Sequence, residues 1–211
     1  GSVRDYIQRQ FAACGVPAHE KAGRLSESIE VMRRLWSEKT IAYEGRYYQL
    51  HDVGILPHPV QKPGIPIWVV ADRNENGFKR VGRLGDGWVT LTHSAEHFAA
   101  ARRKIDQYAR ERGRAGRCPV SALYATFNIH SDGERARQEG WQWMENFFQQ
   151  PREKISYHFT IFGTPQECAD VLKNYLAVGL TTIIARIASD DLRGQARLLL
   201  SELKPRLESL T

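Results

Sequence analysis

The chain has 211 residues, of which 42% are hydrophobic and 26% are charged, a composition typical of one globular domain. No apolar run approaches the roughly 18 residues that a membrane span needs, and three scattered cysteines without a Cys-x-x-Cys motif indicate reduced thiols in a cytoplasmic protein. The net charge is +6, but the densest basic stretch, 102–117, is interrupted by apolar residues at helical spacing, which indicates a solvated helix face rather than a nucleic-acid site.

The first third of the chain predicts a long helix, then a hairpin and a proline-rich loop. Apolar residues recur at spacings of three and four through 17–38, as on one face of a helix. Gly45 separates two aromatic, β-prone runs, so 41–48 is predicted to form a small hairpin. Four prolines within 57–66 predict an extended loop, so that 40–66 as a whole forms an insertion before the first buried strand.

From residue 67 onward, strand and helix patterns alternate. Strands are predicted at 67–71, 88–92, 120–129 and 181–187, and helices at 75–83, 94–112, 132–148, 165–179 and 190–208. Ser94 has the position of an N-cap, and Thr164 opens a capping-box sequence with proline in the first helical turn. Four successive strand–helix units predict an α/β domain, 1–211, with parallel strands and right-handed crossovers.

Two parallel architectures are consistent with this alternation of strands and helices. Four strands alone do not close a (β/α)₈ barrel, which needs about 250 residues. A doubly wound dinucleotide-binding sheet would need a Gly-x-Gly-x-x-Gly turn, and the sequence contains none. No Gly-x-Ser-x-Gly motif supports a hydrolase, and the scattered histidines show no metal-ligand spacing, so no metal site is predicted.

Several blocks of sequence follow one another in a characteristic order. They are RLSESIEVMRRLW from Arg24, YEGRYY from Tyr43, LPHPVQKP from Leu56, IPIWVVA from Ile65, GRLGDGW from Gly82, FGTPQECA from Phe162 and GLTTIIAR from Gly179. In this order and spacing they resemble the luciferase-like family of flavin-dependent monooxygenases, over roughly residues 3–208. None of the blocks is specific alone, but so many in order are hard to obtain by chance.

The resemblance implies a TIM-barrel type of fold in which the four predicted strands are strands five to eight of a (β/α)₈ barrel and the N-terminal strands are missing. It implies oxidation of a small organic substrate with reduced FMN and O₂, with a deazaflavin coenzyme as the nearest variant and a flavin reductase as a candidate partner. The family's early strands hold most of the flavin-ring pocket and its histidine, so the catalytic residues here stay unknown. A non-catalytic flavin-binding or structural remnant of the family is the alternative.

The turn after the first buried strand is the predicted cofactor site. Asp72, Arg73, Asn74 and Asn76 lie where a helix begins, and a helix N-terminus with an arginine suits a phosphate group. The resemblance points to the same turn, since family members bind the flavin phosphate there. The competing interpretation is that Asp72 or Asn74 only caps the helix and Arg73 lies in water.

Polar side chains that alternate along two strands are the predicted lumen or substrate residues. Tyr124, Thr126 and Asn128 share one face of their strand, and Arg186 shares a face with Thr182 and Ile184. An inward arginine needs an anion or a carboxylate, although a simple salt bridge would also satisfy it. His93, which follows the second strand, is either a general base or a plain loop residue. An open lumen face would expose Trp68, Val70 and Ile184, which predicts a homo-oligomer that covers them.

Overall fold

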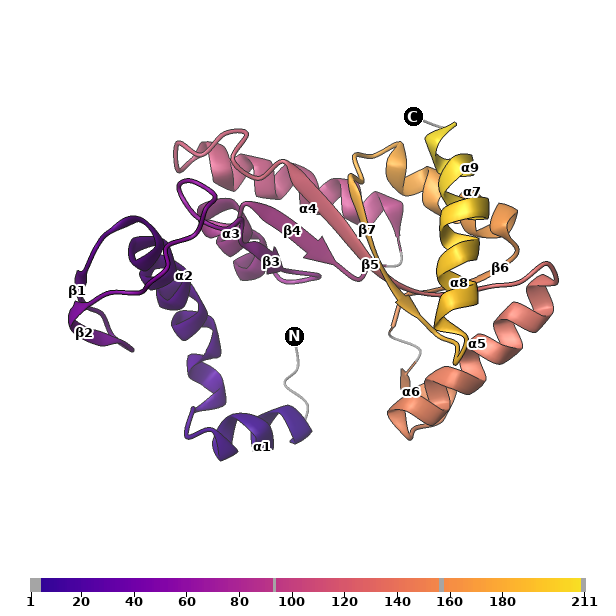
Figure 1. Cartoon of the computed structure of the whole chain (residues 1–211), viewed down its shortest axis with the longest axis horizontal. Helices are drawn as coiled ribbons and strands as arrows, with labels where there is room; N and C mark the ends of the chain where they lie inside the picture. Colours follow the sequence, from indigo (N-terminus) through magenta and orange to yellow (C-terminus); the bar gives the residue numbers. More distant parts are fainter. Residues whose placement is uncertain (1–4, 93, 156–157, 210–211) are drawn as a thin grey trace.

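A parallel sheet of five strands forms the centre of the computed structural model, which describes residues 5–92, 94–155 and 158–209 (Figure 1). The strands are β3 (Trp68–Val70), β4 (Gly87–Thr90), β5 (Val120–Ile129), β6 (Thr160–Gly163) and β7 (Thr182–Ile187). β5, with ten residues, is the longest strand. On one edge its residues 120–123 pair with β4 and its residues 126–129 pair with β6, and on the other edge its residues 122–127 pair with β7. The predicted parallel α/β architecture is therefore confirmed.

The strand β6 was not predicted, so the expectation of four strands was wrong by one. Its four residues pair with Thr126 to Ile129 of β5, directly before the helix that begins at Pro165. Such a short strand carries too little period-two alternation to be recognised, and the neighbouring capping-box signal dominates the local sequence. The capping box itself is present: Thr164 accepts from the Glu167 amide, and the Glu167 carboxylate accepts from the Thr164 amide.

The helices connect the strands as the alternation predicted. They are α1 (Asp5–Ala13), α2 (Lys21–Ser37), α3 (Glu75–Leu84), α4 (Ala95–Arg110), α5 (Gly133–Phe148), α6 (Arg152–Ile155), α7 (Pro165–Leu176), α8 (Leu192–Leu198) and α9 (Lys204–Glu208). The expected single last helix is divided by a π-helical segment, Leu199–Leu203. No helix within the described ranges is long and apolar enough to cross a lipid bilayer.

The hydrophobic core lies between one face of the sheet and the helices α3, α4 and α7. Trp88 is fully buried there, packs against the rings of Phe78 and Phe98, and donates from its indole nitrogen to the Ala71 carbonyl at 2.7 Å. Leu123 and Phe127 of β5 are also fully buried on this face. A central strand buried on both sides of its backbone explains the nearly continuous apolar run of its sequence.

A charged contact joins the N-terminal part to the sheet, in addition to the packing of Ile29 against the core. Arg33 of α2 donates to the Asp86 carboxylate at 2.7 Å and to the Leu84 carbonyl at 2.8 Å, and Asp86 also accepts from the Ile67 amide. Burial raises the pKa of Asp86, but the Arg33 and Ile67 hydrogen bonds and the neighbouring charges outweigh it, so this pKa lies below its ordinary value. Asp86 therefore fixes the position of α2 and of β3 at once.

The predicted hairpin is present, with a shifted boundary. β1 (Ile41–Glu44) pairs antiparallel with β2 (Gln49–Val53), so Tyr47 and Tyr48 belong to the turn and not to the second strand. The Glu27 carboxylate of α2 accepts from the turn amide of Tyr47 at 2.9 Å, which explains why the turn is longer than expected. The 54–67 segment that follows contains neither helix nor strand, as its prolines predicted.

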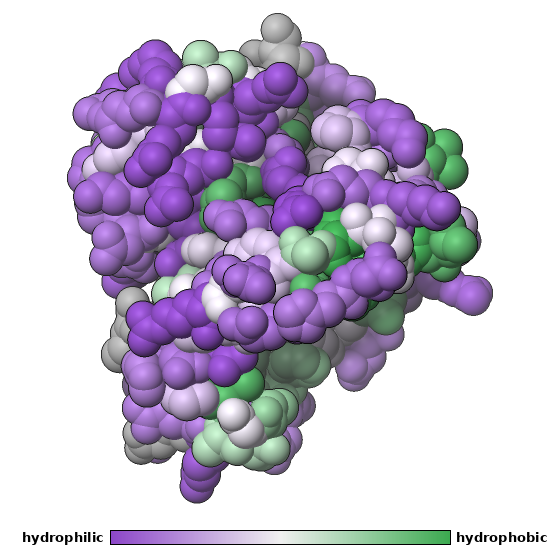
Figure 2. Space-filling model, turned by 90° about the vertical axis from the view of Figure 1, so that its left-hand side faces the viewer, coloured by the Kyte–Doolittle hydropathy of each residue, from purple (hydrophilic) through white to green (hydrophobic). Residues whose placement is uncertain are grey.

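The sheet face opposite the core is open at β3. Trp68 is 39% and Val70 is 61% exposed, as predicted, whereas Ile184 is only partly exposed. Leu56 and Val60 of the proline-rich loop are exposed as well. Figure 2 shows the side of the molecule that carries α2 and the hairpin as mainly hydrophilic, interrupted by hydrophobic patches.

Candidate functional site

The carboxyl ends of the parallel strands lie at one edge of the sheet, and the loops that leave this edge carry the candidate site residues. The first loop, 71–74, connects β3 to α3; the others follow β5 and β7. In barrels of parallel strands this edge holds the active site. Tyr124, Thr126, Asn128 and Arg186 belong to β5 and β7, which pair with Thr126 opposite Arg186.

The turn after β3 is held by side-chain hydrogen bonds. Asn74 is the N-cap of α3, and its Oδ1 accepts from the Gly77 amide at 2.6 Å. The Asp72 carboxylate accepts from the Thr90 hydroxyl at 2.9 Å, and its carbonyl accepts from His97 Nε2 at 2.8 Å. These bonds tie the turn to β4 and α4, so Asp72 and Asn74 are occupied in support of the turn.

Arg73 and Asn76 are exposed in the same turn, and no side-chain hydrogen bond to another described residue ties them to its support. The Arg73 side chain is 76% exposed, and its one ion pair is with Asp72 at 3.3 Å. The Glu75 carboxylate, in the first turn of the helix, accepts hydrogen bonds from Lys104 and Tyr108. The hydrogen bond from Lys104 lowers the pKa of Glu75, and the hydrogen bond to Glu75 raises the pKa of Tyr108 to about 12. The turn thus combines a helix N-terminus with a guanidinium that can turn to a ligand, a donor set that fits a phosphate.

Tyr124 and Arg186 meet on the face of the sheet opposite the core. Arg186 Nε donates to the Tyr124 hydroxyl at 2.7 Å, and the guanidinium also lies over the rings of Phe147 and Phe148 at 5.9 and 5.4 Å. Its Nη1 atom is buried without a hydrogen-bond partner among the described residues. Arg186 therefore shares a face of the sheet with Tyr124, and its hydrogen-bond partner is an aromatic side chain rather than the carboxylate of a salt bridge. That this face lines a barrel lumen stays a prediction.

Thr126 and Asn128 are both 1% exposed. Asn128 Nδ2 donates to the Ala188 carbonyl at 2.7 Å, which joins the end of β5 to the loop after β7. Its Oδ1 atom has no partner among the residues that the structure describes. An unpaired buried acceptor is costly, and it lies at the edge of a cleft.

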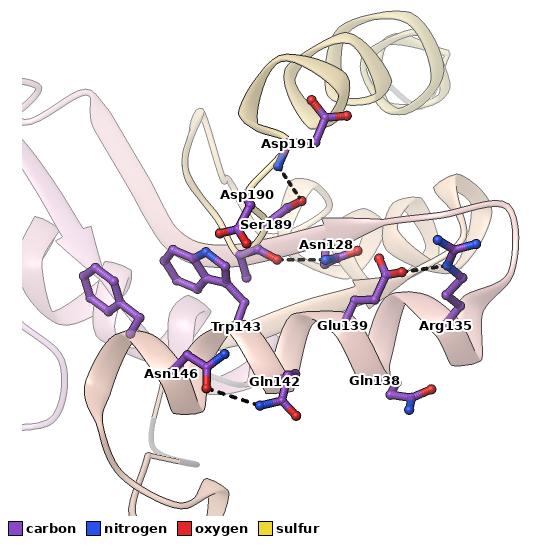
Figure 3. A pocket seen from close by; sticks show the side chains of 12 residues that line it. Asn128, Arg135, Gln138, Glu139, Gln142, Trp143, Asn146, Ser189, Asp190 and Asp191 are labelled. Atoms are coloured by element: carbon purple, nitrogen blue, oxygen red, sulfur yellow. Dashed lines mark hydrogen bonds and ion pairs between the residues drawn. The ribbon is translucent and has the colours of Figure 1, made fainter.

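This cleft, of about 770 Å³, lies between α5 and the loop 188–191 (Figure 3). Trp143 and Phe147 of α5 line it, stacked on each other with their ring centroids 4.8 Å apart. Asn128, Glu139 and Asp190 line it as well. Sequence reasoning missed these α5 and loop residues; the signal that could have found them is Ser189-Asp190-Asp191 directly after a buried strand, where polar residues lie at the strand's carboxyl end.

His93 lies outside the described residues, so the structure does not place it. His97, which was not predicted, supports Asp72 from α4. Gln195 of α8 was also missed: its amide accepts from the Ile129 amide at 2.8 Å and donates to the Ile129 carbonyl at 2.9 Å, as a neighbouring strand would. These two residues stabilise the strand ends around the candidate site.

The sequence profile of the family described as "Luciferase-like monooxygenase" matches residues 1–155, and the chain belongs to this family. Among curated relatives, the F420-dependent glucose-6-phosphate dehydrogenase of Kineococcus radiotolerans is 24% identical over 82% of this chain and 56% of its own length. The enzyme of the same name from Segniliparus rotundus is 26% identical over 90% of this chain and 62% of its own length. The chain thus spans about three fifths of the length of these relatives.

Solved structures show the same fold. The coenzyme F420-dependent tetrahydromethanopterin reductase from Methanopyrus kandleri superimposes with a TM-score of 0.72 at 20% identity, over 88% of this chain and 63% of that one. A monooxygenase from Streptomyces bottropensis gives a TM-score of 0.77 at 22% identity, over 93% of this chain and 65% of that one. At these identities the likeness concerns the fold, which is that of luciferase-like barrel enzymes.

Proposed function

We propose that this chain supplies the cofactor-phosphate turn and part of the substrate site of an oxidoreductase that uses a flavin-type cofactor, FMN or the deazaflavin F420. The observation that carries the proposal is the turn at 71–77, where Arg73 is exposed beside the N-terminus of α3. Its ion pair with Asp72 is long, at 3.3 Å, and the Glu75 carboxylate is bonded to Lys104 instead. The cofactor would supply the redox chemistry, and the protein binds it, orients the substrate and excludes water.

Each candidate residue has a role in this proposal. Arg73 and the first amides of α3 bind the phosphate, while Asp72 and Asn74 hold the turn in shape. Arg186, kept in place by Tyr124, binds an anionic or strongly polar group of a small organic substrate. Thr126 and Asn128 complete the polar wall on the same face of β5. The catalytic group itself stays unassigned.

The named relatives favour two versions of this reaction. The F420-dependent dehydrogenases favour transfer of two electrons between a substrate and a deazaflavin, without O₂. The monooxygenase structures favour reduced FMN with O₂, in which case a flavin reductase would supply the cofactor. A non-catalytic flavin-binding or structural remnant of the family remains the second candidate, because no catalytic group is assigned among the described residues.

Equilibrium titrations with FMN and with F420, followed by fluorescence, test the proposal. We expect saturable binding of one of them, and riboflavin, which lacks the phosphate, should bind at least about tenfold more weakly than FMN if FMN is the ligand, the scale of one or two charge-assisted hydrogen bonds. Binding of neither cofactor would overturn the proposal. Turnover of the bound cofactor with and without O₂ would then separate a monooxygenase, a dehydrogenase and a non-catalytic carrier.

A further inference from the structure

The cleft between α5 and the loop 188–191 has a lining that is rich in hydrogen-bond acceptors. In Figure 3, Glu139 and Arg135 extend from α5 toward the side of the loop, and Gln138, Gln142 and Asn146 extend from the other side of the helix; all five belong to the cleft lining. Asp190 lies above the Trp143 indole in this view, and Asn128 lines the same cleft. The lining therefore combines three carboxylates, four side-chain amides, one guanidinium and an aromatic pair.

Asn128 is the deepest of these groups, and it presents an acceptor. Its amide nitrogen is committed to the Ala188 carbonyl at 2.7 Å, so the amide cannot turn over without losing that bond. Oδ1 has no hydrogen-bond partner among the described residues, in a side chain that is 1% exposed and belongs to the cleft lining. A ligand that donates a hydrogen bond, directly or through a bound water, would satisfy it.

The charge of the cleft favours a cation. Three carboxylates line it, those of Glu139, Asp190 and Asp191, against the single guanidinium of Arg135, which pairs with Glu139 at 2.6 Å. Asp191 caps α8 by accepting from the Gly194 amide. The Asp190 carboxylate, in contrast, makes no hydrogen bond or ion pair to any residue that the structure describes, and it is exposed. An anionic ligand group would meet repulsion here, and an ammonium group would meet attraction.

The aromatic wall has the same preference. Trp143 and Phe147 stack with an interplanar angle of 11°, and Arg186 already lies over the Phe147 ring from outside the cleft lining. The face of an indole ring attracts a cation, and tryptophan is the strongest of the aromatic side chains in this respect. An ammonium group between Asp190 and the Trp143 indole would contact both.

We infer that this cleft binds the protonated amine of a small organic molecule, with Asp190 as its counter-charge, Trp143 as its aromatic wall and Asn128 as an acceptor of a donated hydrogen bond. The cleft opens at the carboxyl ends of β5 and β7, so the inference names the substrate class of the proposed oxidoreductase. It rests on that proposed function only for the ligand's role as substrate, since the binding of the amine does not depend on a cofactor.

The test uses three probes of one shape with different charge. Benzylamine is protonated at pH 7, benzyl alcohol is neutral and benzoate is anionic, and each is titrated into the isotope-labelled full chain without cofactor. We expect benzylamine to bind about tenfold tighter than benzyl alcohol and benzoate to bind weakest, with shifts in the spectrum at the Asn128 side-chain amide and the Trp143 indole. Equal binding of amine and alcohol, preferred binding of benzoate, or shifts elsewhere would overturn the inference.

Two isosteric variants separate the cleft from general charge effects. Asp190→Asn should weaken benzylamine about two- to fivefold, the range of an exposed ion pair. Asp170→Asn makes the same change on an exposed position of α7, outside the cleft lining, and should leave the affinity unchanged. An equal effect of both variants contradicts the assignment. Amine binding without binding of FMN or F420 would support the cleft and overturn the proposed function; cofactor binding without amine preference would do the reverse.

Discussion

Replacement of Arg73 by alanine should weaken cofactor binding and leave the fold intact. The side chain is 76% exposed and its one ion pair, with Asp72, spans 3.3 Å, so its loss costs the folded protein less than about 1 kcal/mol, as for other exposed pairs. A charge-assisted hydrogen bond to a phosphate contributes about 1–3 kcal/mol, so the dissociation constant of FMN or F420 should rise about five- to 150-fold.

The same helix offers a matched control at its other end. Arg83, in the last turn of α3, is also exposed, and a helix of ten residues is about 15 Å long, so Arg83→Ala removes an equal charge far from the phosphate turn. Fluorescence titration of both variants at several salt concentrations, with thermal unfolding in parallel, measures the two effects. Equal affinities of Arg73→Ala and the unchanged chain would refute the assignment, and so would equal losses in the two variants.

Two further predictions concern stability and assembly. The pKa of Asp86 is lowered in the fold, so the stability that its carboxylate contributes is complete above the ordinary aspartate range and is lost as the pH falls through the folded-state pKa. Asp86→Asn should therefore lower the free energy of unfolding by about 1–3 kcal/mol at pH 7 and by less at pH 3. Urea unfolding that gives equal differences at both pH values would contradict this. The exposed Trp68 and Val70 at an open strand edge predict a homo-oligomer at micromolar concentration, and light scattering from a well-behaved monomer that melts cooperatively would show that this surface needs no cover.

The parts of the fold that were predictable are those in which local sequence and burial agree. β5 was predicted at 120–129 and begins and ends at these residues, because its apolar run is long and both faces are buried. The start of α7 was predicted from Thr164, whose capping bonds involve neighbours in sequence only. By contrast, β6 exists because Thr126 to Ile129 offer it a free edge, a condition that its own four residues do not encode.

The candidate site, too, could be predicted from the sequence only in part. The face shared by Tyr124 and Arg186 followed from the alternation of side chains along strands, and the contact between them was found only when the two strands were paired in register. The cleft depends on α5 lying against a loop some 40 residues later in the sequence, and periodicity within α5 carries no information on that neighbour. Trp143 therefore had the pattern of an ordinary core residue.

At both candidate sites, the side chains that hold the local structure differ from those that would contact a ligand. This difference decides which substitutions report on ligand binding. At the phosphate turn, Asn74 and Asp72 are bonded to Gly77 and Thr90, while Arg73 is exposed. At the cleft, Asn128 is buried and bonded to Ala188. Loss of a buried, bonded group destabilises the strand ends along with any site they carry, because its partner is left unpaired. An exposed group that makes few bonds to the fold reports on the ligand, because its removal changes binding while the scaffold that positions it stays as it was.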